Sequence, residues 1–273
     1  MGGVTMKGII KVPLTDVYYY CVPGSEVVTQ AVFATEVVIL KEKGCWYQIQ
    51  IPIQQAYSGW VKKEAVFLGE PPEDFLGKII VRKHRAELKN FPAKSGKKIM
   101  NLVVNTRLWV IQEQKNWYET WLPGGETAWI QAGETSSWEK TLAARDRITG
   151  EQILNVARSF LGTPYLWGGI TPDGADCSGF VYTVYALHGF CLHRDTDLQY
   201  KYDGFPVKLE EIRAGDLIYF YEDVVEKPTH VGIYEADQVF INASSKQNAV
   251  VRYSLSENNW RFKISGIKRI LTV

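Results

Sequence analysis

The sequence DCSGF places Cys177 between a loop rich in Gly and Asp and an apolar segment that is predicted to be a helix. A thiol in the first turn of a helix lies beside unpaired backbone N–H groups and the positive end of the helix dipole. Both favour the thiolate, the nucleophilic form of cysteine. The same N–H groups can supply part of an oxyanion hole. Cys177 is therefore a candidate nucleophile, although an arbitrary cysteine here would more often be a small, unreactive residue.

A base for this thiol is offered by THVGIYEADQVFINAS, which is predicted to form a β-hairpin. If its loop is residues 235–237, Tyr234 pairs with Gln238. The same register pairs His230 with Asn242, and directly opposed side chains have Cβ atoms about 5 Å apart. Asn242 would then fix the tautomer of the imidazole and leave the other ring nitrogen for the thiol. This is the arrangement of nucleophile, base and orienting residue found in cysteine hydrolases.

A second group of polar side chains lies in HGFCLHRD, residues 188–195. Four of them are residue types that bind zinc: His188, Cys191, His193 and Asp195. Their spacing matches no common zinc pattern, and a helix C-terminus favours histidine through its dipole. We therefore expect no metal site. The phosphate-binding patterns GxGxxG and GxxxxGK are absent, so no nucleotide and no other cofactor is expected.

Composition excludes some classes of protein. The chain has 273 residues, of which 46% are hydrophobic, and its 31 basic and 30 acidic side chains give a net charge of +1. Proteins that bind nucleic acid normally carry a basic excess, so no such partner is expected. Four cysteines without a CxxC pair do not form a disulfide framework. We expect Cys21 and Cys45 to be reduced, mostly buried thiols, with a pairing between them left open.

The N-terminal sequence MGGVTMKGIIKVPL has a proline where a secretory signal would be most apolar. No apolar run approaches the roughly 20 residues of a membrane span. A cytoplasmic protein is expected, with a periplasmic or extracellular location as the alternative for a chain whose signal has been removed. Met1 and Met6 are both candidate native starts, and a monomer is the default expectation.

The chain contains an internal repeat, which precedes the elements that are predicted to hold the catalytic residues. Residues 44–66 and 115–134 both contain Trp-Tyr, a short strand, a turn-prone stretch and a second Trp followed by Val or Ile. Short strands separated by turns predict small antiparallel barrels. The predicted barrels span 7–68 and 77–133, and the predicted linkers are 69–77 and 134–147.

The remaining residues, 148–273, are predicted to form an α+β domain. ITGEQILNVARSFLG has the spacing of a capping box, followed by a helix that Gly162 ends. CSGFVYTVYALHG predicts a second helix, ended by Gly189. Strands are predicted at 215–221, 230–235, 238–244 and 263–270. Helices followed by strands favour an antiparallel sheet.

At these residues the sequence resembles the NlpC-type family of bacterial cysteine peptidases, papain-like enzymes that hydrolyse peptidoglycan stem peptides. The matching segments, in the family's order, are GTPYLWGG, DCSGFV, LHRDTDLQ, IRAGDLIYF, THVGIY and FINAS. The resemblance implies that Cys177 is the nucleophile, His230 the base and Asn242 the orienting residue, at a place where many members have histidine. It also implies that Asp176 and Ser178 help to bind the substrate.

The N-terminal repeats resemble bacterial SH3-like domains, which accompany this catalytic domain in enzymes that cleave γ-D-glutamyl–diamino acid bonds. The resemblance places Tyr57, in YSGWV, beside a pocket for a free N-terminal L-alanine, and Asp176 at the alanine ammonium. Tyr165 and Thr229 are further candidates for substrate contacts in the cleft. Arg194 and Asp195 lie where the family has a polar pair, which is expected to form either a substrate contact or a structural ion pair.

Together these features predict two SH3-like barrels followed by a papain-like catalytic domain. The expected reaction is hydrolysis of the γ-D-glutamyl–meso-diaminopimelate or –lysine bond in peptidoglycan-derived peptides with free L-alanine. An amidase, a crosslink-cleaving endopeptidase and a non-catalytic wall-binding protein are the alternatives. The preferred diamino acid, and the choice between murein peptide recycling and wall remodelling, are left open.

Overall fold

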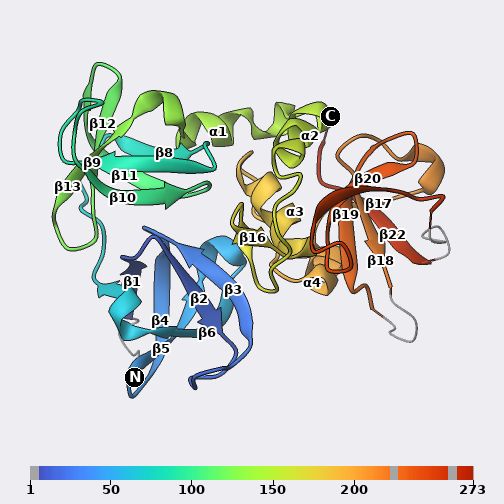
Figure 1. The fold of residues 1–273 in the computed structure, drawn as a ribbon, viewed down its shortest axis with the longest axis horizontal. Helices are drawn as coiled ribbons and strands as arrows, with labels where there is room; N and C mark the ends of the chain where they lie inside the picture. Colours follow the sequence, from blue (N-terminus) through green and yellow to red (C-terminus); the bar gives the residue numbers. More distant parts are fainter. Residues whose placement is uncertain (1–5, 222–226, 258–262, 273) are drawn as a thin grey trace. The chain divides into compact units, whose positions relative to one another are not determined.

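The computed structural model describes residues 6–221, 227–257 and 263–272 (Figure 1). The alternative start at Met1 concerns residues outside these ranges. The chain divides into two compact units, residues 1–142 and 143–273. Within the described ranges, no helix is long and apolar enough to cross a membrane.

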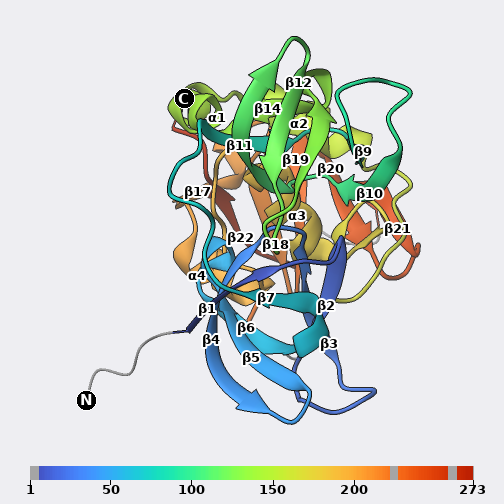
Figure 2. The ribbon, with the colours of Figure 1, turned by 90° about the vertical axis from the view of Figure 1, so that its left-hand side faces the viewer.

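The first unit contains two antiparallel sheets of seven strands each. The strands of the first sheet are β1 (Met6–Ile10), β2 (Leu14–Tyr18), β3 (Val27–Val32), β4 (Glu36–Lys43), β5 (Trp46–Ile51), β6 (Tyr57–Lys62) and β7 (Val66–Leu68). Those of the second are β8 (Gly77–Val81), β9 (Arg85–Lys89), β10 (Lys98–Val103), β11 (Arg107–Gln114), β12 (Trp117–Trp121), β13 (Thr127–Gln131) and β14 (Thr135–Ser137). Figure 2 shows β4, β5 and β6 side by side in the first sheet.

The repeat in the sequence corresponds to a repeat in topology. The strand orders are β3-β2-β6-β5-β4-β1-β7 and β10-β9-β13-β12-β11-β8-β14, which are the same order counted from the first strand of each sheet. In both sheets the Trp-Tyr pair begins the fifth strand, at Trp46 in β5 and at Trp117 in β12. In β5 the isoleucines Ile49 and Ile51 alternate with polar glutamines and are fully buried, as expected for a strand with one face on a core. The prediction of two small antiparallel β domains is confirmed.

The second sheet continues beyond residue 133, the predicted end of the second barrel. Strand β14 pairs with β8, with Ser136 opposite Ile80, and α1 (Trp138–Ala144) follows directly. Much of the predicted polar linker 134–147 is therefore regular structure. The short edge strand has no apolar residue among Thr135–Ser137, so it lacks the alternation that identifies strands from sequence. The division at 7–68, 77–133 and 148–273 stays a prediction.

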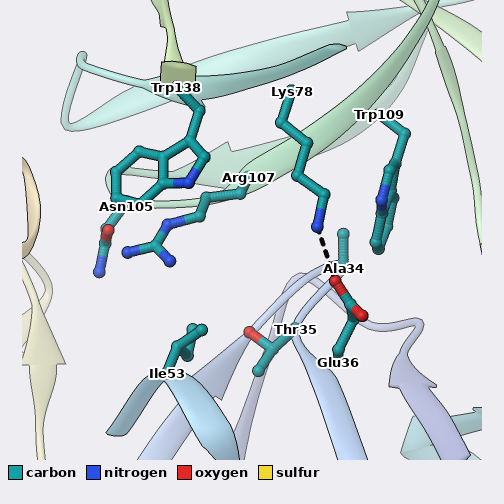
Figure 3. A pocket seen from close by; sticks show the side chains of 9 residues that line it. All are labelled: Ala34, Thr35, Glu36, Ile53, Lys78, Asn105, Arg107, Trp109 and Trp138. Atoms are coloured by element: carbon teal, nitrogen blue, oxygen red, sulfur yellow. Dashed lines mark hydrogen bonds and ion pairs between the residues drawn. The ribbon is translucent and has the colours of Figure 1, made fainter. Parts of the chain in front are cut away.

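The two sheets of the first unit share a buried cluster, in which Phe33 of the first lies with Leu108 and Trp109 of the second. A cavity of about 60 Å³ lies beside this cluster (Figure 3). Across it, Lys78 Nζ pairs with Glu36 Oε1 at 2.7 Å, joining β8 to β4.

The second unit is an α+β domain with an antiparallel sheet, as predicted. Its helices are α2 (Gly150–Ser159), α3 (Cys177–Ala186) and α4 (Thr196–Tyr202), and β15 (Ile170–Thr171) and β16 (Gly174–Ala175) form a short hairpin. The main sheet contains β17 (Phe205–Val207), β18 (Leu217–Phe220), β19 (His230–Ala236), β20 (Val239–Ser244), β21 (Ala249–Ser254) and β22 (Ile264–Arg269). Its strand order is β17-β22-β18-β19-β20-β21.

Helix α2 packs against α3, the helix that begins with Cys177. The capping box predicted for α2 is present, because Thr149 accepts from the N–H of Gln152 and Gln152 Oε1 accepts from the N–H of Thr149 at 2.9 Å. Phe160, which caps the other end, lies edge-on to Phe180 of α3 with ring centres 5.8 Å apart. All residues of α3 are buried, as expected for a helix that is apolar on every side. Figure 1 shows α3 next to β19, against which it packs.

Candidate active site

Cys177 is the first residue of α3, and its sulfur lies in a buried position. The side chain of Asp176 caps the helix by accepting from Gly179 N at 2.7 Å. The sulfur lies 3.6 Å from Thr196 Oγ1 and 4.0 Å from the carbonyl oxygen of Thr229. The N–H groups of Val231 and Ser178 also donate to it. The nucleophile candidate therefore contacts the peptide groups on both sides of His230.

The ring of His230 is held by Asn242. His230 Nε2 lies 3.0 Å from Asn242 Oδ1, and Asn242 Nδ2 donates to the carbonyl oxygen of Val251 on β21 at 3.4 Å. Since the amide nitrogen is used on Val251, its oxygen faces the ring, and Nε2 must carry the hydrogen. Nδ1 is then the ring nitrogen that can accept a proton from a thiol.

The register of the hairpin differs from the predicted one. The loop is Asp237–Gln238, both in the left-handed region, and Tyr234 pairs with Phe240 rather than with Gln238. A bulge follows Tyr234. The prediction that His230 lies directly opposite Asn242 is therefore wrong.

His230 and Asn242 still contact each other because the register differs from the predicted one by an even number of residues. The observed register, continued from the pair Ile233–Ile241, places Gly232 opposite Asn242, a shift of two residues. Side chains alternate between faces with a period of two, so His230 and Asn242 stay on the same face. They are diagonal neighbours, within reach of a long aromatic side chain.

Gly232 has no side chain, and this leaves room for the side chain of Asn242. The sequence analysis did not predict this role. A Cβ atom at Gly232 would lie 2.5 Å from Phe240 Cδ2 and 3.2 Å from Asn242 Cβ. Any side chain here would therefore displace Phe240 or Asn242. The glycine within THVGIY was the available signal, because glycine inside a strand often marks a close approach.

Arg194 holds the first turn of α3 through an ion pair with Asp176, the structural alternative that the sequence left open for it. It is 1% exposed, and its Nη1 and Nη2 donate to Asp176 Oδ1 and Oδ2 at 3.0 and 2.6 Å. Nη1 also donates to Ser178 Oγ at 3.0 Å. Asp176 Oδ2 accepts further from Gly168 N at 2.8 Å. A guanidinium offers this forked geometry, which an ammonium does not.

This network bears on the predicted substrate contacts of Asp176 and Ser178. Each carboxylate oxygen already accepts from Arg194 and from a backbone N–H, and Ser178 Oγ donates to Oδ1 at 3.3 Å. The structure thus shows Asp176 in a positioning role. Its contact with a substrate ammonium stays a prediction.

Gln199 ties α4 to the same helix turn. Its Nε2 donates to the carbonyl oxygens of Ser178 and His193 at 3.1 and 2.9 Å, and the residue is fully buried. This contact between distant segments has no signature in the sequence.

The other predicted site residues lie in different surroundings. Thr229 is exposed, and its N–H donates to Phe220 O at 2.9 Å while its carbonyl faces the sulfur. Asp195 precedes α4 and is half-buried, as is Tyr165. Tyr57 begins β6 in the first unit and is half-buried. Their roles stay predictions.

The residues weighed as zinc ligands make other contacts. His193 Nδ1 lies 2.8 Å from Asp203 Oδ1, and its ring lies 5.1 Å from that of Tyr202. In the part of the chain that the structure describes, no three His, Cys, Asp or Glu side chains are grouped as metal ligands.

The four cysteines differ in burial. All are free thiols, with Cys177 buried, Cys21 half-buried and Cys45 and Cys191 exposed. The expectation that Cys21 and Cys45 are mostly buried is therefore wrong, because both lie in loops at the rim of the first sheet, Cys45 next to β5 and Cys21 after β2.

Burial also decides the protonation of the nucleophile. Burial, and secondly the negative charge of Asp176, raise the pKa of the Cys177 thiol to about 11. The hydroxyl of Thr196 and the N–H groups of Val231 and Ser178 act in the opposite direction and do not outweigh these two causes. The expectation of a resting thiolate is therefore wrong. Near neutral pH the residue is a thiol that needs a base.

The chain matches two family profiles. The NlpC/P60 family profile matches residues 162–269, the range that contains Cys177, His230 and Asn242. The profile of the YKFC SH3b2 domain matches residues 81–137, which includes β14.

Proteins of known name are similar to the chain. The γ-D-glutamyl-L-lysine dipeptidyl-peptidase of Bacillus cereus is 29% identical over 257 residues, which is 89% of this chain and 75% of that protein. A probable endopeptidase of Haemophilus influenzae is 36% identical over 128 residues, 44% of this chain and 78% of that protein. The crystal structure of an NlpC/P60 family protein from Bacillus cereus has a TM-score of 0.83 at 24% identity, over 97% of this chain and 99% of that chain. The two share a fold.

The raised pKa predicts how Cys177 reacts with iodoacetamide. In a variant with Cys21→Ser, Cys45→Ser and Cys191→Ser, the alkylation rate should rise about tenfold per pH unit from pH 7 to 9.5, because the thiolate fraction rises in proportion. Adding Cys177→Ala to this variant removes the last of the four cysteines and gives the background rate of the reagent. A plateau for Cys177 already at neutral pH would contradict the neutral resting thiol.

Replacing Arg194 should destabilise the fold. Arg194→Gln leaves the buried carboxylate of Asp176 without its counter-charge, and we expect the free energy of unfolding in urea to fall by about 3–5 kcal/mol. Arg252→Gln is the matched control, since Arg252 pairs with Glu235 at the surface and is 46% exposed. Its loss should cost at most about 1 kcal/mol. Equal losses of unfolding free energy in the two variants would contradict the role of Arg194 in holding Asp176.

Proposed function

The chain belongs to the NlpC/P60 family, and from this premise we propose that it is a cysteine peptidase that hydrolyses the γ-D-glutamyl–diamino acid bond of peptidoglycan stem peptides. The diamino acid is meso-diaminopimelate or L-lysine, and the preferred peptide has a free N-terminal L-alanine. The observation that carries the proposal is the position of the Cys177 sulfur against the peptide groups that flank His230. The name of the Bacillus cereus relative supports the choice of bond.

The first half of the reaction forms a thioester. As the sulfur of Cys177 attacks the γ-carbonyl carbon of D-glutamate, its proton moves to His230 Nδ1. Backbone N–H groups at the start of α3 stabilise the oxyanion. His230 then gives the proton to the leaving amine of the diamino acid, the C–N bond breaks, and the acyl group stays on the sulfur.

The second half uses the same residues in reverse. His230 takes a proton from water, whose oxygen attacks the thioester carbonyl. Collapse of the intermediate releases L-Ala-D-Glu, and the proton returns to the sulfur. Asn242 holds the ring through both halves by accepting from Nε2, and it adds no charge. Histidine or a carboxylate at this place would stabilise the imidazolium more strongly.

The part of the proposal that concerns the L-alanine rests on Asp176, and a contact with Tyr57 is carried over from the resemblance of the first barrel to SH3-like domains. A free ammonium would have to share an oxygen of Asp176 with Arg194, and it would add a second positive charge to that carboxylate. An acylated alanine lacks this charge and adds bulk, so long uncut strands would be poor substrates. Tyr165, Ser178, Asp195 and Thr229 are proposed as further substrate contacts.

Hydrolysis of a defined tripeptide tests the function. With L-Ala-γ-D-Glu-L-Lys or its meso-diaminopimelate analogue, mass spectrometry should detect the dipeptide L-Ala-D-Glu and the free diamino acid. Cys177→Ala should lower the rate by at least about 10⁴-fold, because no other group forms the thioester. Thermal unfolding of this variant should match that of the wild type. Substantial hydrolysis by the folded variant would contradict the mechanism.

Matched substrates separate the alternatives in the same assay. The tripeptide with acetylated alanine should be cleaved at least about 100-fold more slowly if the free ammonium is recognised. Cleavage of the muramyl–L-alanine amide bond would indicate an amidase. Cleavage of crosslinked dimers, without cleavage of the tripeptides, would indicate a crosslink endopeptidase. Binding of peptidoglycan without any cleavage would indicate a wall-binding protein.

The orienting role of Asn242 predicts a specific kinetic effect. Asn242→Ala should lower kcat by about 10² to 10⁴, with little change in KM, because the ring loses the hydrogen bond that fixes its tautomer. Asn242→His should restore much of kcat, since a histidine can accept from the same ring nitrogen. A kcat unaffected by Asn242→Ala would exclude this role.

A further inference from the structure

A large cavity lies in the second unit, between α4 and the strands β17 and β22. Its volume is about 630 Å³, within the range of roughly 300–1,000 Å³ that is typical of small-molecule sites. Its lining comes from α4, β17 and β22 and from Lys227 and Pro228, which precede β19. No role has been given to this cavity so far.

Two residues that line the cavity are sequence neighbours of residues that contact the Cys177 sulfur. Asp197 follows Thr196, whose hydroxyl lies 3.6 Å from the Cys177 sulfur. Pro228 precedes Thr229, whose carbonyl oxygen lies 4.0 Å from it. Consecutive Cα atoms are about 3.8 Å apart. The cavity wall thus adjoins the segment that leads into His230, where the leaving amine must lie to receive its proton.

The floor of the cavity is apolar and fixed. Tyr200 contributes its ring, and its hydroxyl donates to Ser265 O at 3.0 Å. A Cβ atom at Gly266 would lie 2.8 Å from that hydroxyl, so the glycine allows the ring to lie against β22. Such a floor suits the methylene chain of a diamino acid.

The charges at the cavity are mostly positive. Its described lining has three lysines, Lys201, Lys227 and Lys268, and one acidic residue, Asp197. Asp197 Oδ2 pairs with Lys227 Nζ at 2.7 Å, and Lys227 is 65% exposed. The ammonium groups of Lys268 and Lys201 lie over the rings of Tyr200 and Tyr202, at 5.3 and 4.8 Å. Asp195 and Asp203, which are not part of the lining, also act on Lys227 and Lys268. Within the lining itself three ammonium groups face one carboxylate, which favours an anionic group there over a further ammonium.

We propose that this cavity binds the diamino acid on the amine side of the scissile bond and selects meso-diaminopimelate over L-lysine. The side chain of meso-diaminopimelate ends in an ammonium and a carboxylate, whereas that of lysine ends in an ammonium alone. The carboxylate is the group that the lysines recognise. This inference rests on the proposed function, because it concerns the leaving group of that reaction.

The test compares kcat/KM for L-Ala-γ-D-Glu-meso-diaminopimelate and L-Ala-γ-D-Glu-L-Lys, two peptides that differ only in that carboxylate. The wild type should prefer the first by at least about tenfold, a discrimination of the size of one charge-assisted contact. Lys268→Met and Lys227→Met should each reduce this ratio at least about threefold, mainly through KM of the diaminopimelate peptide. Lys227→Met also releases Asp197 from its ion pair and should have the larger effect.

The control is Lys246→Met, at an exposed position of the turn between β20 and β21 that does not line the cavity. It should leave the ratio unchanged, and thermal unfolding should show that all three variants are folded. Equal cleavage of both peptides by the wild type, or a ratio that does not respond to Lys227 and Lys268, would overturn the inference while the proposed function stands. Failure to cleave either peptide would overturn both.

Discussion

The hydrogen bond between His230 and Asn242 decides which nitrogen of the imidazole can take a proton from the nucleophile. It depends on a chain of contacts through the sheet: Val251 O accepts the amide N–H, which turns the amide oxygen toward Nε2. Gly232 leaves the space in which the fully buried Asn242 lies. A neutral side chain can therefore fix the tautomer of a base, because its own orientation is fixed by the next strand.

The second constraint on the site is the burial of the Cys177 thiol, which determines its protonation. A charged sulfur in this surrounding would lose its hydration, and the pKa of Cys177 is accordingly raised. Asp176 lies next to it, but its charge is paired with Arg194 within the protein. The same ion pair holds the helix turn that carries the sulfur. The raised pKa favours the neutral thiol near pH 7, so that activation of the nucleophile depends on a base rather than on the helix dipole.

Much of this arrangement could be predicted from the sequence. The capping box at Thr149, the position of Cys177 at the start of a helix and the repeat of Trp-Tyr are local signals, and the structure has all three elements. The shared face of His230 and Asn242 was predicted from an incorrect register. It holds because the error was an even number of residues, to which the alternation of a strand is insensitive.

What the sequence analysis missed depends on contacts between distant segments. The ion-pair partner of Arg194 is Asp176, 18 residues away, and Gln199 of α4 donates to carbonyl oxygens of Ser178 in α3 and of His193. The lysines of the cavity come from three separate stretches of chain. The pKa of Cys177 depends on how completely the surrounding elements exclude water, which the residues near it in the sequence do not determine. Strand β14 was missed for another reason, since an edge strand of polar residues resembles a linker.

The central claim is that His230 carries its ring hydrogen on Nε2, where Asn242 accepts it, so that Nδ1 is the nitrogen that takes the proton of the Cys177 thiol. Nitrogen-15 NMR of protein labelled at histidine tests it directly, because protonated and unprotonated ring nitrogens have distinct chemical shifts. At pH 7 the account predicts one protonated nitrogen for His230, Nε2, and a shift of that signal in Asn242→Ala. Two protonated ring nitrogens at pH 7, lost on Cys177→Ala, would show a resting thiolate–imidazolium pair and contradict the account.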